Sequence, residues 1–375
     1  MLKARKEGTM SARKVLYPCA LAFLSLILAC GDDTPSGPEA EPRLLWRAQI
    51  GERVASSPKL ANGLVYVGGS EGYVHCLEAE TGRDEWLYQC SRDITSDPCV
   101  ADGKVFIVSD DSLLCLDAKD GRLLWTYRGT SRIGCNPVAA PGKLFFIHYG
   151  IITCLNADNG DRLWRAYNKR EEDFYGTPCL YKGKLYVADM KHFFCFNAEN
   201  GEPIWEAPLG DKYYPRSPCA ENGKVFLSIN GYDSEVFDLL KCYDASSGKL
   251  LWTYNFGYNR GISDAAAGYG KAYVNGGGAD SRCTRCFDGS TGKLLWESRT
   301  GTTAQTKPCV ANDKVFIGAE QETVVCVSAE SGNRLWQYQI PRGNEIFDIR
   351  GQPAYADGRL FVDTDGLYIY CLKAD

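Results

Sequence analysis

Cysteine and histidine are the residue types in this chain that are best suited to chemistry. The sequence of 375 residues holds 17 cysteines and three histidines, His75, His148 and His192. Two of the cysteines, Cys283 and Cys286, have the CxxC spacing that redox and zinc sites use. This pair lies in a strand-like run rather than at the start of a helix, and Cys286 also belongs to a repeated unit. We therefore interpret the pair as structural.

The three histidines do not form a catalytic pattern. His75 lies beside Cys76, whereas His148 and His192 lie near predicted turns of neighbouring repeats, where they could approach each other. No carboxylate spacing supports a metal site around them, and the sequence contains no GxSxG, HExxH or P-loop pattern. We expect the turn histidines to face solvent, and we predict no catalytic residue and no metal ligand.

A repeated unit determines where most of the cysteines lie. Cys115-Leu-Asp-Ala-Lys-Asp-Gly121-Arg-Leu-Leu-Trp125 predicts a strand, a tight turn at the glycine and a second strand. In every complete copy the glycine follows the cysteine by six residues and the tryptophan follows the glycine by four. The other complete copies begin at Cys76, Cys154, Cys195, Cys242, Cys286 and Cys326.

The spacing of the tryptophans predicts the architecture. All eight belong to these units, at intervals of 39–47 residues, which suit four short strands per repeat: Trp46, Trp86, Trp125, Trp164, Trp205, Trp252, Trp296 and Trp336. The chain ends on half a unit, from Cys371 to Asp375, and the other half lies at Trp46. We predict an all-β, eight-bladed propeller of four-stranded blades over residues 43–375, whose last blade is closed by the N-terminal strand.

The first 42 residues predict export. Basic residues precede a short apolar run, from Val15 to Leu28, which is typical of a signal peptide and too short for a membrane span. The run ends at Ala29-Cys30, which resembles the lipobox of bacterial lipoproteins and implies acylation of Cys30. The alternative is an ordinary cleaved signal peptide, and Met10 is a possible start. We predict a lipoprotein signal over residues 1–30 and a flexible tether over 31–42, rich in proline, glycine and aspartate.

The repeated unit resembles the tryptophan-docking motif of quinoprotein dehydrogenase propellers, which use pyrroloquinoline quinone (PQQ). It also resembles the repeats of BamB-type outer-membrane assembly lipoproteins. The resemblance covers residues 43–375 and implies that each tryptophan stacks on a glycine turn of a neighbouring blade. The first position of the motif is usually alanine in this family, whereas it is cysteine in all eight units here. Cysteine fits because it is small and tolerates burial.

Fifteen cysteines remain in the predicted propeller once Cys19 and Cys30 are assigned to the signal. Cysteines on the first and third strands of one blade would lie about 9–10 Å apart because the second strand separates them. A disulfide needs roughly 4.4–6.8 Å between Cα atoms. We expect buried free thiols, and bridges between blades remain the alternative.

The resemblance also bears on cofactors. The family's enzymes have an adjacent cysteine pair, an additional tryptophan beneath the quinone, and carboxylates that bind calcium. This chain has no Cys-Cys pair, and its tryptophans all belong to the repeated units. We therefore expect neither PQQ nor calcium, and a non-enzymatic relative.

The loops between blades, together with those between second and third strands, share one face of a propeller, here named the loop face. Arginine and tyrosine there are candidates for partner binding, because both are enriched at interface hot spots; the alternative is a solvated face with internal ion pairs. The candidates are Arg53, Arg92, Arg132, Tyr213, Tyr214, Arg216, Arg260 and Arg350. Positions five residues before each inner-strand proline, or its equivalent, are expected to ring the channel mouth: Arg53, Asp93, Arg132, Asp173, Tyr213, Arg260, Thr303 and Asp348.

The longest insertion, from Asn230 to Leu239, is expected to project from the loop face in the fifth blade. Its Val236-Phe237 and Leu239-Leu240 pairs either form an apolar contact for a partner or begin the next strand.

Two functions fit the sequence. The first is a non-catalytic, lipid-anchored scaffold that binds other envelope proteins, as in outer-membrane protein assembly. The alternative is a quinoprotein-like enzyme or a propeller that binds a small ligand or carbohydrate. The net charge of −5 argues against nucleic-acid binding. We expect a monomer in the bacterial cell envelope, periplasmic or at the outer membrane, with membrane contact through the lipid only.

Overall fold

The computed structural model describes residues 43–375 except 51–52, 130–131, 171, 233–234, 259–260, 277–281, 303–305, 342–348, 350 and 365. Cys30, Arg260 and Arg350 therefore lie outside the described residues. The described residues form 33 strands and no helix, so none of them belongs to a helix that could cross a membrane. Residues 42–375 form one compact unit.

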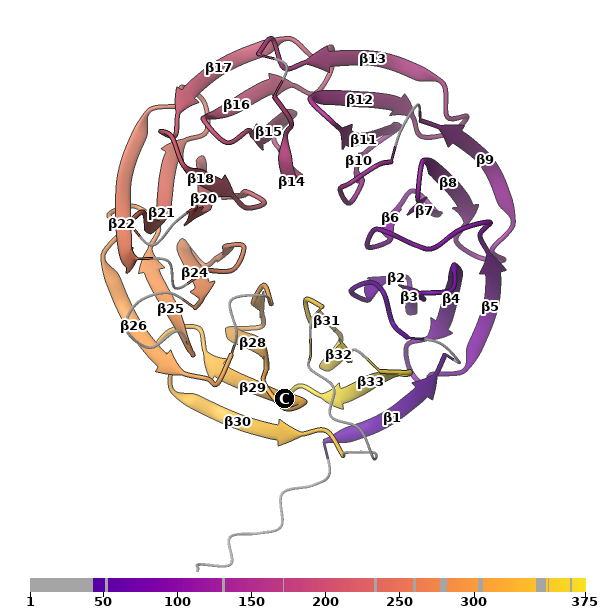
Figure 1. Ribbon diagram of the computed structural model, residues 1–375. Helices are drawn as coiled ribbons and strands as arrows, with labels where there is room; N and C mark the ends of the chain where they lie inside the picture. Colours follow the sequence, from indigo (N-terminus) through magenta and orange to yellow (C-terminus); the bar gives the residue numbers. More distant parts are fainter. Residues whose placement is uncertain are drawn as a thin grey trace, which may run out of the picture. The chain divides into compact units, whose positions relative to one another are not determined.

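The strands form eight sheets arranged as the blades of a ring (Figure 1). Blade 1 contains β2 (Lys59–Ala61), β3 (Leu64–Gly68), β4 (Tyr73–Glu78) and β5 (Asp84–Gln89), and blade 2 contains β6 (Cys99–Ala101), β7 (Lys104–Ser109), β8 (Ser112–Asp117) and β9 (Leu123–Arg128). Blade 3 contains β10 (Val138–Ala140), β11 (Lys143–His148), β12 (Ile151–Asn156) and β13 (Arg162–Tyr167), and blade 4 contains β14 (Tyr175–Tyr181), β15 (Lys184–Ala188), β16 (His192–Asn197) and β17 (Pro203–Pro208). Blade 5 contains β18 (Tyr213–Pro215), β19 (Cys219–Glu221), β20 (Lys224–Gly231), β21 (Phe237–Asp244) and β22 (Leu250–Tyr258). Blade 6 contains β23 (Ala266–Gly268), β24 (Lys271–Asn275), β25 (Cys283–Asp288) and β26 (Leu294–Arg299), and blade 7 contains β27 (Cys309–Ala311), β28 (Lys314–Ala319), β29 (Thr323–Ser328) and β30 (Arg334–Gln339). Blade 8 contains β31 (Ala354–Ala356), β32 (Arg359–Asp363), β33 (Tyr368–Lys373) and β1 (Leu44–Gln49).

The predicted eight-bladed propeller and its closure are confirmed. Strand β1 pairs with β33, with Trp46 opposite Cys371, and the two strands lie side by side although they come from opposite ends of the chain (Figure 1). One blade differs from the prediction of four strands, because blade 5 has five. Its extra strand β18 pairs with the far end of β20, which is long enough to hold both β18 and β19.

Each blade is built on a ladder of large and small side chains. In blade 2, Cys99 lies opposite Phe106, Phe106 opposite Cys115, and Cys115 opposite Trp125. Phe106 and Cys115 are completely buried. The ring of Phe106 lies between Cys99 and Cys115, so the cysteines of the first and third strands are separated by the second strand, as predicted. Phe106 also contacts Trp125, with ring centroids 5.9 Å apart.

The tryptophans connect neighbouring blades. Trp125 lies over the turn of blade 3 at Gly160, where an added Cβ would come within 2.7 Å of the indole. Its Nε1 donates a hydrogen bond to the Ala157 carbonyl at 3.2 Å. Gly160 has a φ of +77° and is therefore suited both to the tight turn and to the close approach of the ring.

Candidate partner-binding face

Three of the four predicted arginines that the structure describes are exposed on the loop face. Arg53, Arg92 and Arg132 are exposed, and Arg92 forms an ion pair with Asp110 at 2.8 Å. Exposed ion pairs of this kind contribute little to stability, typically about 0–1 kcal/mol. The structure thus leaves these side chains accessible without bringing them into one cluster.

A different set of residues lines the central channel. They are the residues immediately before the inner-strand prolines, or before Ala265 in blade 6, and they surround a cavity of about 630 Å³. The described residues that were expected there, five positions before each proline, do not line this cavity. Their placement at the mouth of the channel stays a prediction. The eight residues at these positions, which line the cavity together with neighbouring residues, are Ser57, Asp97, Asn136, Thr177, Ser217, Asp264, Lys307 and Gln352.

Hydrogen bonds connect this inner ring from blade to blade. The Ser57 amide donates to Asp97 Oδ1 at 2.8 Å, and the Asp97 amide donates to Asn136 Oδ1 at 2.8 Å. The Gln352 amide donates to Ser57 Oγ at 3.0 Å and so joins the last blade to the first. Proline at the next position favours extended backbone, which directs each amide toward the following blade. The inner ring therefore connects neighbouring blades around the channel.

The charges of the channel do not gather at one point. Asp97 and Asp264 belong to blades 2 and 6, which lie opposite each other in a ring of eight. Asp97 pairs with Lys59 at 3.3 Å. Among the described residues, no group of three histidine, cysteine or acidic side chains is placed to hold a metal ion.

The cysteines are not arranged for redox chemistry in the described part of the chain. All fifteen propeller cysteines, including Cys283 and Cys286 on β25, have free thiols. Burial raises the pKa of Cys219 to about 12 and that of Cys179 to about 11, although the charge of Lys307 opposes the shift in both. Thiols with such pKa values are protonated at neutral pH and are poor nucleophiles.

The prediction that the turn histidines face solvent was wrong for His148, and His192 is half-buried. His148 is only 2% exposed and His75 only 7%, because both still belong to strands β11 and β4, which neighbouring blades cover on both faces. Burial lowers the pKa of both side chains; the nearby charge of Arg165 lowers that of His148 further.

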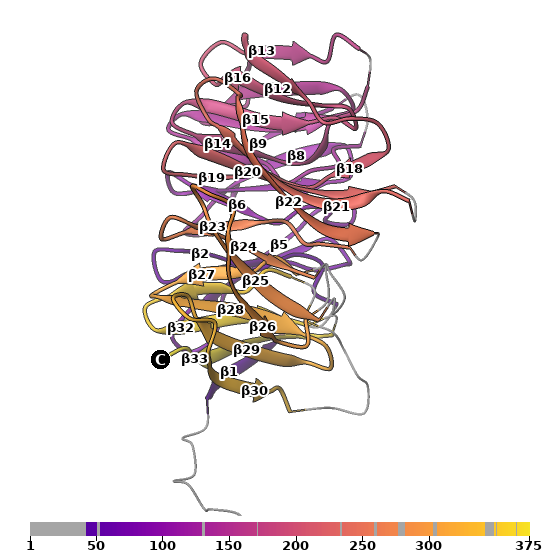
Figure 2. The ribbon, with the colours of Figure 1, turned by 90° about the vertical axis from the view of Figure 1, so that its left-hand side faces the viewer.

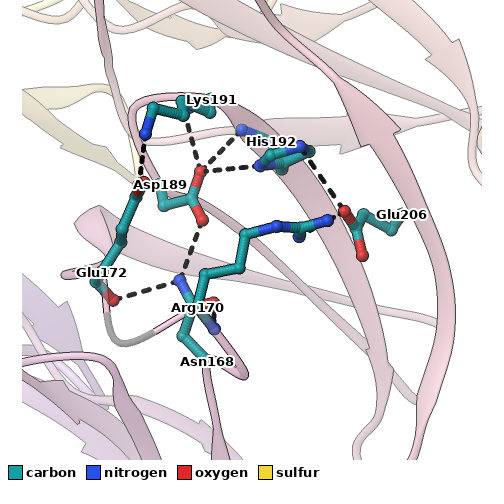
Figure 3. A network of polar contacts seen from close by, with 7 residues as sticks. All are labelled: Asn168, Arg170, Glu172, Asp189, Lys191, His192 and Glu206. Carbon is teal, nitrogen blue, oxygen red and sulfur yellow. Dashed lines mark hydrogen bonds and ion pairs between the residues drawn. The ribbon is translucent and has the colours of Figure 1, made fainter.

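His192 belongs to a polar network at the junction of blades 3 and 4 (Figure 3). The buried Asp189 accepts hydrogen bonds from the amides of Lys191 at 2.8 Å and His192 at 2.6 Å. It also accepts one from the side chain of Asn168 at 2.8 Å. Glu172 accepts from Lys191 Nζ at 2.6 Å and, through its carbonyl, from Asn168 at 3.0 Å. The network fixes the loop after β13 on the turn before β16.

An aromatic cluster lies on the loop face at blades 4 and 5. Tyr214 on β18 packs between Tyr175 and Tyr232, with ring centroids 6.3 and 5.2 Å apart. Tyr214 is 40% exposed and Tyr232 is 56% exposed. The sheet fixes the position of Tyr214 in this cluster, because Tyr214 on β18 pairs with Asn230 on β20. The cluster contains the predicted Tyr214, whereas Tyr175 and Tyr232 were missed.

The other two predicted residues of this region are less accessible. Tyr213 and Arg216 are half-buried, and the ammonium of Lys241 lies 5.9 Å from the Tyr213 ring centroid. Burial lowers the pKa of Lys241. Tyr213 therefore packs on its own blade rather than facing a partner.

The insertion of blade 5 extends its strands. The ends of β21 and β22 project on one side of the ring (Figure 2). Leu239 and Leu240 are buried within β21, so of the two alternatives they begin the strand. Phe237 packs on Tyr258 at 4.4 Å, and Tyr258 is 55% exposed. This pair adds a second aromatic contact beside the tyrosine cluster.

Comparisons with known proteins give the family. A family model described as outer membrane protein assembly factor BamB matches residues 39–228 and 236–375. BamB of Shewanella oneidensis is 26% identical over 178 residues, which span 44% of this chain and only 43% of that relative's length. The structure of BamB from Moraxella catarrhalis has a TM-score of 0.70 at 14% identity, over 89% of this chain and 98% of that one. A europium-containing methanol dehydrogenase has a TM-score of 0.68 at 14% identity, over 88% of this chain and 93% of that one. At 14% identity the two solved structures show that the fold is shared and no more. The family model, by contrast, matches most of the sequence. The chain therefore belongs to the family of the outer membrane protein assembly factor BamB.

Proposed function

We propose that this protein is a non-catalytic scaffold in outer-membrane protein assembly that binds other envelope proteins through its loop face. The observation that carries the proposal is the cluster of Tyr175, Tyr214 and Tyr232, the last two of them exposed, on a BamB-family propeller. Tyrosine supplies a large contact area at a low entropic cost and is enriched at hot spots. Exposed Arg53, Arg92 and Arg132, in the loops before blades 1, 2 and 3, add charged contacts elsewhere on the same face.

The proposal includes a lipid anchor at Cys30 and a monomeric propeller in the cell envelope. Ala29-Cys30 after an apolar run supports acylation. Cys30→Ser should move the protein from the detergent phase to the aqueous phase in detergent partitioning. If the variant stays in the detergent phase, the anchor lies elsewhere.

A dehydrogenase-like activity is the second candidate, favoured by the shared fold with a methanol dehydrogenase. The residues present do not fit a quinone held with calcium. Asp97 and Asp264 lie on opposite blades, and the part of the chain that is described offers no cluster of three metal-binding side chains. We expect no dye-linked alcohol oxidation when PQQ and calcium are added to the purified protein, and measurable turnover would overturn the scaffold proposal.

The scaffold proposal is tested by affinity purification from detergent-solubilised membranes. Wild-type protein should recover outer-membrane assembly proteins, identified by mass spectrometry, and Tyr214→Ser/Tyr232→Ser should recover at least tenfold less. The matched control is Leu295→Ser/Leu335→Ser, which changes two residues that are 43% and 49% exposed on the outer strands. Recovery of no assembly protein by the wild type, or full recovery by the tyrosine variant, would refute the proposal.

A further inference from the structure

The outer strands of four blades have a tyrosine two residues after the tryptophan. These tyrosines are half-buried and point toward the next blade, as the tryptophans do: Tyr88, Tyr127, Tyr254 and Tyr338. The contacts of two of them define the slot between blades. The Tyr254 ring lies 4.6 Å from that of Phe287 in blade 6, and the Tyr127 ring lies 5.5 Å from that of Phe146 in blade 3.

Blade 3 has Ala166 at this position, and a cavity of about 470 Å³ lies there, against blade 4. Its floor consists of Phe194 and Phe196, which are 7% and 4% exposed. Gly201 and Pro203 of blade 4 also line it. Phe196 occupies the position in β16 that Phe287 occupies in β25, directly after the repeated cysteine. The cavity is therefore the slot of a tyrosine that this blade lacks.

The polar groups at the rim match those of an occupied slot. Arg170 forms an ion pair with Glu206 across the mouth of the cavity (Figure 3). Glu206 directly follows the tryptophan of its strand, as Glu297 does in blade 6, where Glu297 pairs with Arg285 beside the slot of Tyr254. In the slot of blade 2, Arg165 donates a hydrogen bond to the Tyr127 hydroxyl at 2.7 Å. A guanidinium thus accompanies the phenol elsewhere in the ring.

Two other alanines, Ala48 of blade 8 and Ala207 of blade 4, occur at this position, and at Ala207 the chain itself fills the equivalent space. Ala207 of blade 4 faces Lys241 of blade 5, whose ammonium donates to the Leu209 carbonyl at 3.1 Å. Among the described residues that line the cavity at Ala166, Arg170 reaches Glu206 across the mouth, whereas Phe194 and Phe196 form the floor and leave the space between them open. The space at Ala166 is therefore available to a group from outside.

We infer that this cavity, here named the blade 3–4 pocket, binds the tyrosine side chain of a partner polypeptide. The phenyl ring would lie on Phe194 and Phe196, and its hydroxyl would meet the Arg170 guanidinium and the Glu206 carboxylate, so that apolar and charged groups are both matched. The volume exceeds that of one ring and falls within the usual range of about 300–1,000 Å³ for ligand pockets, which leaves room for the flanking backbone. The pocket opens at the rim beside Tyr167, which is 60% exposed. None of the loop-face tyrosines Tyr175, Tyr214 and Tyr232 lines it, so either site can fail without the other.

The experiment measures binding of acetyl-Gly-Tyr-Gly-amide to the full chain by saturation-transfer NMR and titration. Acetyl-Gly-Leu-Gly-amide and p-cresol serve as comparison probes. Ala166→Tyr fills the pocket from within, as four other blades do, while Ser298→Tyr places the same residue at the equivalent position of blade 6. Tyr254→Ala opens a second slot. Phe196→Leu keeps an apolar floor but removes its ring, and circular dichroism verifies the fold of each variant.

We expect one saturable site in the wild type, at least tenfold weaker binding in Ala166→Tyr, and unchanged binding in Ser298→Tyr. Tyr254→Ala should bind close to two equivalents, and Phe196→Leu should bind at least threefold more weakly than the wild type. The inference is overturned if folded Ala166→Tyr binds as the wild type does, if the wild type shows no saturable binding, or if the leucine peptide binds equally well. Binding of p-cresol as tight as that of the tyrosine peptide would assign the pocket to small phenols, and a crystal structure with Tyr167 folded into it would assign it to the chain itself.

Discussion

At the scale of single residues, the repeated cysteine acts as a packing group. Cys115 lies between Phe106 and Trp125 and is completely buried, so its thiol is shielded from water on all sides. Burial raises its pKa to about 12. Cys76, Cys154, Cys195, Cys242, Cys286, Cys326 and Cys371, at the same position of the other blades, have their pKa raised to about 12 for the same reason.

These thiols predict a loss of stability at alkaline pH. In the unfolded chain a thiol has a pKa of about 8.5. The folded state keeps its protons up to a pH near 12, so it binds more protons than the unfolded state between these values, and the free energy of unfolding falls as pH rises through this window. Below a pH of about 8.5 the buried thiols keep their full contribution to the free energy of unfolding. The measurement is the urea midpoint at pH 7.5 and pH 10, with reductant present.

A double variant gives the control for this pH effect. Cys115→Ala/Cys154→Ala should show a smaller drop between the two pH values than the wild type. Fifteen propeller thiols should be alkylated in denaturant, and these should react far more slowly in the folded protein at pH 8. Equal pH sensitivity of variant and wild type would mean that other groups cause the effect.

Asp97 is the residue of the inner ring with the most partners. It accepts hydrogen bonds from the Ser57 amide at 2.8 Å and from Asn136 Nδ2 at 3.1 Å, and it pairs with Lys59. Asp97→Ala leaves these donors without their acceptor and should lower the free energy of unfolding by about 1–3 kcal/mol. Asp97→Asn keeps one acceptor oxygen and should cost less. Chemical denaturation measures both, and equal losses would show that the hydrogen bonds are not the cause.

At the scale of elements, the glycine turn between the third and fourth strands connects one blade to the next. Gly160 has a φ of +77° and lies against Trp125, whereas Gly183 has a φ of +71° in a turn of blade 4 and would have no atom within 4 Å of an added Cβ. The two glycines therefore share the backbone conformation, but an indole ring lies against Gly160 alone.

This pair separates backbone strain from packing. Gly183→Ala should cost about 1–2 kcal/mol, which is the usual penalty for a side chain in left-handed backbone. Gly160→Ala should cost that amount plus about 1–3 kcal/mol, because the new methyl group would displace the indole. Denaturant unfolding gives the two free energies, and Trp fluorescence should shift only in Gly160→Ala. If Gly160→Ala loses no more stability than Gly183→Ala, the contact with Trp125 adds little to the free energy of unfolding.

The elements could be predicted well from the sequence and the candidate sites only in part. The spacing of cysteine, glycine and tryptophan is local, so it predicted the strands, the turns and the split blade. The tyrosine cluster joins residues of β14 and β18 with Tyr232, which directly follows β20, and no local pattern brings Tyr175 to Tyr214. His148 was misassigned because a strand end and a turn look alike in sequence. The blade 3–4 pocket depends on a missing side chain at Ala166, which only an alignment of the repeats with one another would reveal.

At the scale of the whole molecule, the ring is closed by strand β1. Besides its ladder with β33, Arg43 completes the closure, because its guanidinium lies 4.3 Å from the centre of the Trp336 ring. Trp336 Nε1 donates to the Ala374 carbonyl at 3.1 Å. The seven other tryptophans lie over a glycine of the next blade, so at the closure an arginine replaces the glycine turn that the ends of the chain interrupt. The stability of the whole propeller therefore depends on its first strand.

The closure is tested by removing β1. A version that starts at residue 43 should unfold at the wild-type midpoint, whereas one that starts at residue 53 loses Trp46 and the partner of β33. Removal of a packed tryptophan alone costs about 3–5 kcal/mol, and the exposed β33 edge should promote association of the open rings, visible as larger species in size-exclusion chromatography. A synthetic peptide of residues 43–50, added in excess, should restore the monomer and raise the midpoint, since it binds only the folded ring. If the shorter version remains monomeric with the full midpoint, the other seven blades hold the ring without β1.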